Sequence, residues 1–318
     1  MSGPAAWRRL KLWASMMRYG RSHNRKFARE HLDFYERLKR DIEPRLGDLR
    51  DLRVLEVGCG KMWGLTLLRN SAGAGATGFD TEWVEMGFRP SKYWGLWRAN
   101  GLERALRTFA WDVFFARTYY RELERIAPFP LRFDGLDVHR SSVTEMDFEP
   151  ESFDLIVSHE VFEHLPDIDG ALASLERVMK PEALTYLYIH SFTSISGGHH
   201  IAWKKPDTEP SRTVPPWDHL RERRFPDIPS WINGWREHQY RASFDARFEV
   251  LEWIHTEREG EALLTPEVRA ELGDYSEEEL LTKGFIAIAR RRPPLRSRDD
   301  AGADAGGGAA PPGRSGVD

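Results

Sequence analysis

Apolar residues cluster along the chain in short runs, which are separated by polar turns or by patterns of helical period. Runs of about four to eight residues that are bounded by turn residues are typical of buried β-strands. Runs of this kind occupy residues 53–57, 75–80, 134–139, 153–158, 184–190, 248–255 and 284–290. The pattern therefore predicts a seven-stranded sheet.

Helical patterns fill the gaps between several of these runs. "GLTLLRN" follows the first run and "IDGALASLERVMK" follows the fourth. In the second of these, Ile168, Leu172, Leu175 and Met179 lie on one helical face. Strands that alternate with helices form a parallel sheet with right-handed crossovers and helices on both faces. We therefore expect an α/β fold, whose sheet the last two runs complete.

Two long segments interrupt this alternation, and both are candidates for a cap over the sheet. The first, residues 81–133, carries apolar residues at helical spacing, which favours either a helix that covers the sheet edge or a lid. These residues are Leu102, Leu106, Phe109, Val113 and Tyr120. The second, residues 191–245, is rich in Trp, His and Arg. It follows the fifth run, so we expect it to start at the carboxyl edge, where such sheets bind ligands.

Both ends of the chain lie outside the predicted domain of residues 50–291. Residues 1–49 are predicted to form a helical extension with an apolar stripe that either docks on the domain or makes a peripheral membrane contact. The stripe consists of Trp7, Leu10, Trp13 and Met17. The segment lacks the apolar core and the cleavage site of a secretory signal. Residues 292–318 are rich in Pro, Gly and Ala and are predicted to be disordered.

Composition and charge narrow the functional classes. The 318 residues include 46 basic and 50 acidic ones, a net charge of -4 that gives no overall footprint for nucleic acid. Cys59 is the single cysteine, which excludes an internal disulfide framework. No apolar stretch approaches the roughly 20 residues of a membrane span. We therefore expect a cytoplasmic protein that does not bind nucleic acid.

The first strand runs directly into "EVGCGKMWG", where Gly58 and Gly60 allow a tight turn and a close approach to a ligand. Asp80 ends the second strand, twenty residues beyond Gly60, where a carboxylate can accept both hydroxyls of a ribose. A plain tight turn with a capping aspartate is the alternative. NAD is disfavoured, because its fingerprint needs a third glycine where this chain has Trp63.

The stretch "SHEVFEHLPD", residues 158–167, is reminiscent of the zinc-protease helix H-E-x-x-H. That motif needs histidines four residues apart on one helical face. His159 and His164 are five apart. Five residues correspond to about 140° around a helix, so the two side chains would diverge. The spacing therefore disfavours a zinc-protease site.

Together, "VLEVGCG", Asp80 and residues 148–181 resemble the class I S-adenosylmethionine-dependent methyltransferases, especially type 11 and the ubiquinone-biosynthesis O-methyltransferases. The resemblance implies a Rossmann-like sheet and S-adenosyl-L-methionine as cofactor. It places the methionine end near the glycine turn, the ribose at Asp80, and the sulfonium beside the end of the fourth strand. The cofactor-binding residues that it implies are Glu56, Gly58, Cys59, Gly60, Asp80, Ser142, Val143, His159 and Glu160.

The chain departs from this family at two points. Lys61 and Met62 follow the glycine turn where the family commonly has Thr-Gly, and the next glycine is Gly64, so we expect a reshaped turn. Ser142 stands where an aspartate often lies near the adenine amino group. Its hydroxyl can still accept a hydrogen bond.

In this family the "HEVFEH" stretch begins where the methyl group and the acceptor meet. His164 is a candidate catalytic base, because an unperturbed imidazole has a pKa of about 6.5. A helix-capping role for His164 is the alternative. His199, in "GGHH", is a second catalytic candidate on a loop predicted to be flexible, and its neighbour His200 could position the acceptor. Aromatic residues in the second segment suit a ring-bearing or sugar-like acceptor. An anionic acceptor could instead be held by Arg221, Arg223 or Arg224.

Glu160, Glu163 and His164 also resemble the E-x-x-E-H of magnesium-dependent RNA-end 2'-O-methyltransferases. That family continues with a further histidine where this chain has Leu165, and no spacing matches a zinc ligand set. The sequence therefore predicts no metal.

The sequence as a whole predicts a methyltransferase that acts on a small molecule or glycan, at oxygen. Two alternatives stay open: a metal-dependent RNA-end 2'-O-methyltransferase, and a non-catalytic binding module that kept the nucleotide fold. The set of Glu56, Gly58, Gly60 and Asp80 argues against the binding module.

Overall fold

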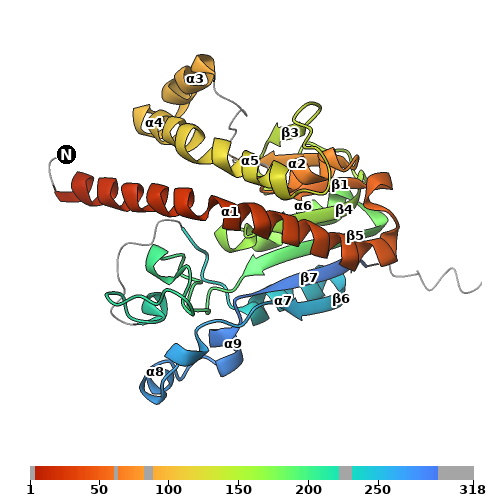
Figure 1. Cartoon of the computed structure of the whole chain (residues 1–318). Helices are drawn as coiled ribbons and strands as arrows, with labels where there is room; N and C mark the ends of the chain where they lie inside the picture. The colour runs from red at the N-terminus through yellow and green to blue at the C-terminus, as the bar shows by residue number, and fades with distance from the viewer. Residues whose placement is uncertain (1–3, 61–63, 82–88, 222–230, 293–318) are drawn as a thin grey trace, which may run out of the picture.

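A computed structural model describes residues 4–60, 64–81, 89–221 and 231–292. Its centre is a seven-stranded sheet with the order β3-β2-β1-β4-β5-β7-β6 (Figure 1). The strands are β1 Arg53–Val57, β2 Gly75–Asp80, β3 Asp137–Arg140, β4 Phe153–His159, β5 Met179–His190, β6 Phe248–His255 and β7 Gly284–Arg291. The expected α/β, Rossmann-like fold is confirmed.

The direction of the strands places the site. β1 to β5 are parallel to one another, and β7 is antiparallel to both of its neighbours. From β1 the chain first builds outward to β2 and β3, and then returns to β4 on the other side. Such a reversal leaves a crevice at the carboxyl ends of the two central strands.

Helices cover both faces of the sheet. They are α1 Pro4–Leu46, α2 Gly64–Ser71, α3 Pro90–Asn100, α4 Leu102–Trp111, α5 Arg117–Ile126, α6 Ile168–Val178, α7 Glu237–Arg247, α8 Pro266–Glu271 and α9 Glu277–Leu281. One apolar core lies between the sheet and α6 and α7, and the other lies between the sheet and α1, α2 and α5. On β4, Leu155 and Val157 face the second core while Ile156 faces the first. This alternation is the period of a strand buried on both faces.

The predicted elements match the observed ones closely, with two shifts. The strand expected over 134–139 begins only at Asp137. Helix α6 ends at Val178, so Met179, expected on its apolar face, is instead the first residue of β5. Met179 pairs with Phe153, next to a register shift between β4 and β5. Its side chain is still fully buried in the core that α6 covers.

The two long segments have different structures. The second packs large apolar residues of its own against α8 and α9, and the fully buried Trp217 donates its indole N–H to the carbonyl of Leu280 at 3.2 Å. In the first, α3 and α4 pack on each other and project from the body of the molecule (Figure 1). Of the two alternatives for its apolar stripe, cover of the sheet edge is wrong for Leu102, Leu106, Phe109 and Val113, which are exposed, and a lid stays a prediction.

The helical extension is confirmed as helix α1, a single helix of 43 residues. Several expectations fall on residues or side chains outside the described part of the chain. They concern the stripe Trp7, Leu10, Trp13 and Met17, the turn positions Lys61, Met62 and Trp63, Arg223 and Arg224, and the tail from residue 293 onward. No helix in the described ranges is long and apolar enough to cross a membrane.

Candidate functional site

Two glycines form the turn between β1 and α2. The backbone angle φ is 71° at Gly58 and 65° at Gly60, in the left-handed region that favours glycine. A Cβ atom at position 58 would lie 2.3 Å from a side-chain carbon of Val161. The amide of Gly60 donates to a carboxylate oxygen of Asp80, 3.0 Å away. The carboxylate predicted to bind ribose therefore also fixes the glycine turn.

A cavity of about 940 Å³ opens at the carboxyl ends of β1, β2 and β4. Its volume is within the range of about 300 to 1,000 Å³ that is typical of small-molecule sites. Its walls include every residue predicted to bind the cofactor: Glu56, Gly58, Cys59, Gly60, Asp80, Ser142, Val143, His159 and Glu160. The structure thus brings the whole predicted set together around one space.

Glu56 contributes to this wall from a buried position. Its carboxylate accepts a hydrogen bond from the hydroxyl of Thr66 and lies 3.8 Å from the fully buried guanidinium of Arg69. Burial raises the pKa of Glu56, and the charge of Arg69 opposes that rise. These contacts tie β1 to α2 directly behind the glycine turn, so Glu56 shapes the turn as well as lining the cavity.

A second cavity of about 520 Å³ adjoins the first. Its walls come from α1, the ends of β4, β5 and β7, and the loop after β5. The residues common to both cavities are His31, Phe34, His159, Glu160 and His164. The two spaces therefore meet at the end of β4, where the predicted sulfonium neighbours and one predicted base lie.

Helix α1 supplies two wall residues that the sequence did not reveal. His31 lies 2.5 Å from the hydroxyl of Tyr119 through its Nδ1 atom, and burial lowers its pKa to about 4. The Phe34 ring lies 4.4 Å from the ring of His159. His31 and Phe34 belong to a face of α1 that packs on the sheet, and a histidine within that face is the one sequence signal that could have indicated them.

Glu160 lies at the junction in a conformation unusual for its residue type, with φ at 55°. Its Oε1 atom is 3.8 Å from Nδ1 of His190. Burial alone would raise the pKa of Glu160, but nearby His159, His190 and His199 hold it well below its usual range. Glu160 is therefore a carboxylate, and it brings negative charge to the wall shared by the two cavities.

His164 ends a short 3-10 turn, Phe162–His164, that follows β4. Its Nδ1 atom lies 2.8 Å from the backbone carbonyl of Trp231. A carbonyl oxygen can only accept, so Nδ1 carries the proton and Nε2 of the neutral ring keeps its lone pair. That lone pair can take a proton from a substrate or bind a metal.

His199 reaches the same place from the loop after β5. It also has a left-handed backbone, with φ at 55°, and its Nε2 atom lies 3.2 Å from Nδ1 of His190. His190 in turn lies 2.8 Å from the hydroxyl of Ser196, which contacts the buried carboxylate of Glu259 at 2.5 Å. Burial lowers the pKa of His199 to about 3 and that of His190 to about 4. The network orients both rings, and burial keeps them neutral.

The loop that carries His199 is packed rather than flexible, contrary to the expectation from its glycines. A Cβ atom at Gly197 would lie 2.2 Å from the carbonyl oxygen of Ser191, and one at Gly198 would lie 2.6 Å from the ring of His219. Both glycines are therefore needed for close packing. The side chain of His200 accepts from the amide of Ala202 at 3.1 Å and caps a turn.

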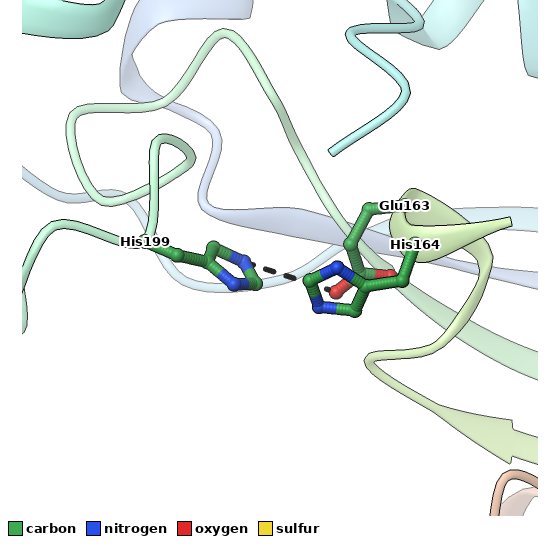
Figure 2. Close-up of side chains that lie close together, drawn as sticks. All are labelled: Glu163, His164 and His199. Carbon is green, nitrogen blue, oxygen red and sulfur yellow. Dashed lines mark ion pairs between the residues drawn. The ribbon is translucent and has the colours of Figure 1, made fainter. Parts of the chain in front are cut away.

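Glu163, His164 and His199 point toward one another (Figure 2). One potential ligand atom from each lies within 4.8 Å of the other two. Glu163 is 1% exposed, and neither of its carboxylate oxygens has a hydrogen-bond partner among the described residues. Burial raises its pKa well above the usual value. A buried carboxyl group without a hydrogen-bond partner among the described residues, next to two imidazole rings, fits the donor set of a divalent transition metal.

Two further residues predicted to bind a ligand, Arg221 and Ser142, make contacts that stabilise the fold. Arg221 lies 2.7 Å from Glu271 and donates to the carbonyl of Pro216, so it anchors the second segment to α8 and lines neither cavity. Ser142 lines the first cavity and caps the turn that follows β3 by accepting from the amide of Thr144 at 3.4 Å.

Part of the chain matches a known protein family. The model of a methyltransferase domain family matches residues 111–187, which contain β3, β4 and most of β5 but not the glycine turn. No curated protein matches the sequence.

Several solved structures are similar over most of the chain. A protein from Pyrococcus horikoshii is 12% identical, covering 83% of this chain and 92% of its own, with a TM-score of 0.45. A putative S-adenosylmethionine-dependent methyltransferase from Listeria monocytogenes is 12% identical, covering 80% and 97%, with a TM-score of 0.43. A third, an S-adenosylmethionine-dependent methyltransferase from Mesorhizobium loti, is 14% identical, covering 79% and 95%, with a TM-score of 0.43.

The matched segment contains the strand end and the turn at which the two cavities meet. β4, the 3-10 turn and α6 all lie within residues 111–187. The part of the chain at the junction of the two cavities is therefore similar to a methyltransferase domain.

Proposed function

We propose that the enzyme methylates an oxygen of a small polar molecule or a glycan, with the cofactor in the 940 Å³ cavity and the acceptor in the 520 Å³ cavity. The observation that carries this proposal is the wall shared by the two cavities at the end of β4. A methyl group that leaves the first space there enters the second directly. Holding the two reactants in line at such a junction can contribute about 7 to 11 kcal/mol toward the barrier in favourable cases.

The roles within the first cavity follow from its walls. Asp80 binds the ribose hydroxyls, Ser142 and Val143 lie against the adenine, and the turn from Glu56 to Gly60 holds the methionine end. His159 and Glu160 lie beside the sulfonium, where the negative charge of Glu160 favours the cationic cofactor. The ubiquinone-biosynthesis subtype stays a prediction.

The walls of the second cavity favour a hydroxyl-bearing acceptor. Besides its histidines, they carry charged side chains of both signs: Lys26, Glu30, Asp33, Arg37, Lys204, Glu257 and Lys283. Some of these pair with one another, as Lys283 does with Glu257 at 2.8 Å. A wall of paired charges and neutral imidazoles offers many hydrogen bonds but little net charge, which suits a sugar or polyol better than a flat apolar ring.

His164 is the proposed base. His164 lines both cavities at their junction, and the carbonyl of Trp231 fixes the ring orientation. As the acceptor oxygen bonds to the methyl carbon and the carbon–sulfur bond breaks, the hydroxyl proton passes to His164. The products are the methyl ether and S-adenosylhomocysteine. His199 positions the acceptor from the opposite side.

The test combines binding and turnover. We expect calorimetry to detect S-adenosyl-L-methionine binding, and we expect labelled methyl groups to pass to simple glycosides or polyols rather than to phenols or amines. Binding without transfer to any hydroxyl compound would contradict the acceptor class. Absence of cofactor binding would favour a non-catalytic module.

The Glu163, His164 and His199 cluster favours a second candidate function, a metal-dependent O-methyl transfer such as that of the RNA-end 2'-O-methyltransferases. The lone Nδ1–H of His164 already donates to a carbonyl, as in many metal-bound histidines. A divalent cation held there would supply Lewis-acid activation of the acceptor hydroxyl. In that case Glu163 binds as a carboxylate.

Chelation separates the two candidates. Without a metal requirement, EDTA leaves methyl transfer unchanged. Activity that EDTA abolishes and Mg²⁺ or Mn²⁺ restores would favour the second candidate, and RNA with a free 3' end would then join the acceptors to be tested. Glu163→Gln is the matched variant, because it keeps the shape of the side chain but removes the charge that a cation needs.

A further inference from the structure

Helix α4 buries small residues and exposes its large apolar ones. The buried residues are Ala105, Thr108 and Ala110. Its outward side carries a continuous apolar stripe of Leu102, Leu106, Phe109 and, just beyond its end, Val113, which are 56%, 56%, 41% and 41% exposed. An amphipathic helix normally turns such a stripe toward a core. Here the stripe faces outward.

Helix α3 enlarges this apolar face. Trp94 and Trp97 are 56% and 46% exposed, and their rings contact each other at 5.0 Å between centroids. Tyr93 joins the two helices by an edge contact with Phe109 at 5.4 Å. Seven of the ten exposed large apolar residues in the described ranges fall between positions 94 and 114. Scattered exposed residues need no explanation, but a gathered set marks an interaction surface.

The charge of this segment differs from that of the whole chain. Residues 90–121 contain six basic and two acidic residues, a net charge of +4, whereas the chain has -4. Lys92 and Asp112 pair with each other at 2.6 Å, so the excess comes from arginines. Of these, Arg98, Arg107, Arg117 and Arg121 are exposed. Apolar and indole side chains next to basic ones are the composition of helices that lie at a membrane surface.

The N-terminal part of α1 projects toward the same end of the molecule as α3 and α4 (Figure 1). Residues 1–29 contain eight basic residues and no acidic one. Two basic segments of the chain therefore extend past the sheet in one direction. The rest of the chain supplies the acidic excess, so the charge of the molecule is polarised.

We propose that the face formed by α3 and α4, defined by Trp94, Trp97, Leu102, Leu106 and Phe109, docks on the surface of a membrane that contains anionic lipids. The apolar side chains enter the interface, and the arginines contact the headgroups. This surface is distinct from both cavities, because none of its five residues lines either of them.

The experiment is co-sedimentation of the full chain with two kinds of vesicle, phosphatidylcholine alone and phosphatidylcholine mixed with phosphatidylglycerol. We expect binding to the mixed vesicles, weaker binding to the neutral ones, and a loss of binding at high salt. The double variant Leu102→Ser/Leu106→Ser should bind the mixed vesicles about tenfold more weakly, since two buried apolar side chains are removed from the interface. Trp94→Ser/Trp97→Ser is an independent second variant.

Leu251→Ser is the matched control, because Leu251 is an exposed leucine of β6, 37% exposed and distant in sequence from this face. It should bind like the parent. The proposal is overturned if the parent ignores mixed vesicles, or if both double variants, with unchanged thermal unfolding, bind them as the parent does. It is also overturned if the face instead mediates self-association, seen as a dimer in sedimentation velocity that Leu102→Ser/Leu106→Ser abolishes.

Discussion

The two segments that interrupt the fold, residues 81–133 and 191–245, differ in how far their tryptophan side chains are exposed. In the second, Trp203 and Trp217 are 1% and 0% exposed, and both indole N–H groups donate to backbone carbonyls. In the first, Trp94 and Trp97 are about half exposed. The second segment forms an apolar core with α8 and α9 and holds His199 in the wall of the 520 Å³ cavity. Tryptophans in the two segments can therefore serve a site or a surface, and burial decides which.

The largest expected effect is on catalysis. His164→Ala should lower kcat by about 10² to 10⁴, the usual span for acid-base catalysis, with little change in cofactor affinity. His199→Ala, in the second segment, should act mainly on KM for the acceptor, because a positioning residue contributes to ground-state binding. Steady-state kinetics with a water-soluble acceptor measures both.

The first segment supplies the control for this prediction. Leu106→Ser should leave both kinetic constants unchanged with a water-soluble acceptor, because Leu106 lines neither cavity. If His199→Ala lowers kcat and His164→Ala does not, the base lies in the second segment. If Leu106→Ser lowers kcat, the division between the two segments is wrong.

The next effect is on stability, and here one residue type can be compared in both segments. Trp217→Ala removes a fully buried indole and should cost about 3 to 5 kcal/mol of unfolding free energy. Trp97→Ala should stay within about 0.5 kcal/mol, as exposed substitutions usually do. Urea unfolding measures both. Similar losses in the two variants would mean that α3 and α4 are buried in solution.

The sequence predicted residues at strand ends but not residues whose position depends on how a helix packs. The cofactor residues sit at the ends of β1, β2 and β4 and just after β3, and chain position alone brings strand ends together at one edge. His31 and Phe34 could not be assigned in this way, because the rotation of α1 against the sheet depends on packing. Leu102 to Val113 show the same limit, since periodicity reveals an apolar face but not which way it points.

Long-range partners were equally hidden. The orientation of His164 depends on the carbonyl of Trp231, 67 positions away, and backbone carbonyls carry no sequence signal. His199 reaches Glu163 only because the loop after β5 folds back over tight glycine contacts. The resemblance to the E-x-x-E-H motif suggested Glu160 beside Glu163 and His164, and the sequence predicted no metal, whereas the observed cluster contains His199.

A smaller effect is expected at the cofactor. Asp80→Ala should weaken S-adenosyl-L-methionine binding at least tenfold, about 1.4 kcal/mol, since a charge-assisted pair with the ribose is lost. Part of the loss in affinity would come from the hydrogen bond that the Gly60 amide donates to Asp80. Asp80→Asn separates the two contributions, because its amide oxygen can still accept from Gly60. Calorimetric affinity unchanged in both variants would exclude the ribose role.

The smallest effect concerns pH, and it again separates the segments. His255 of β6 lies 2.7 Å from Glu237 of α7 and 3.1 Å from Glu278 of α9, the helix that supports the core of the second segment. Burial would lower the pKa of His255, but its hydrogen bond and charge interaction with Glu237, together with Glu278, raise it above 6.5. A raised pKa in the folded state means that this contribution to stability is full below the unfolded value and is lost as pH rises through the folded one. The free energy of unfolding should therefore decrease above about pH 6.5 in the parent and decrease less in His255→Gln. The difference should be less than about 1 kcal/mol, because the pair is partly exposed.

Residues 81–133 contain no histidine, so vesicle binding through α3 and α4 should not change over the same pH interval. Thermal unfolding and co-sedimentation at matched pH values measure the two responses, and a parallel change in both would show that the two segments are coupled.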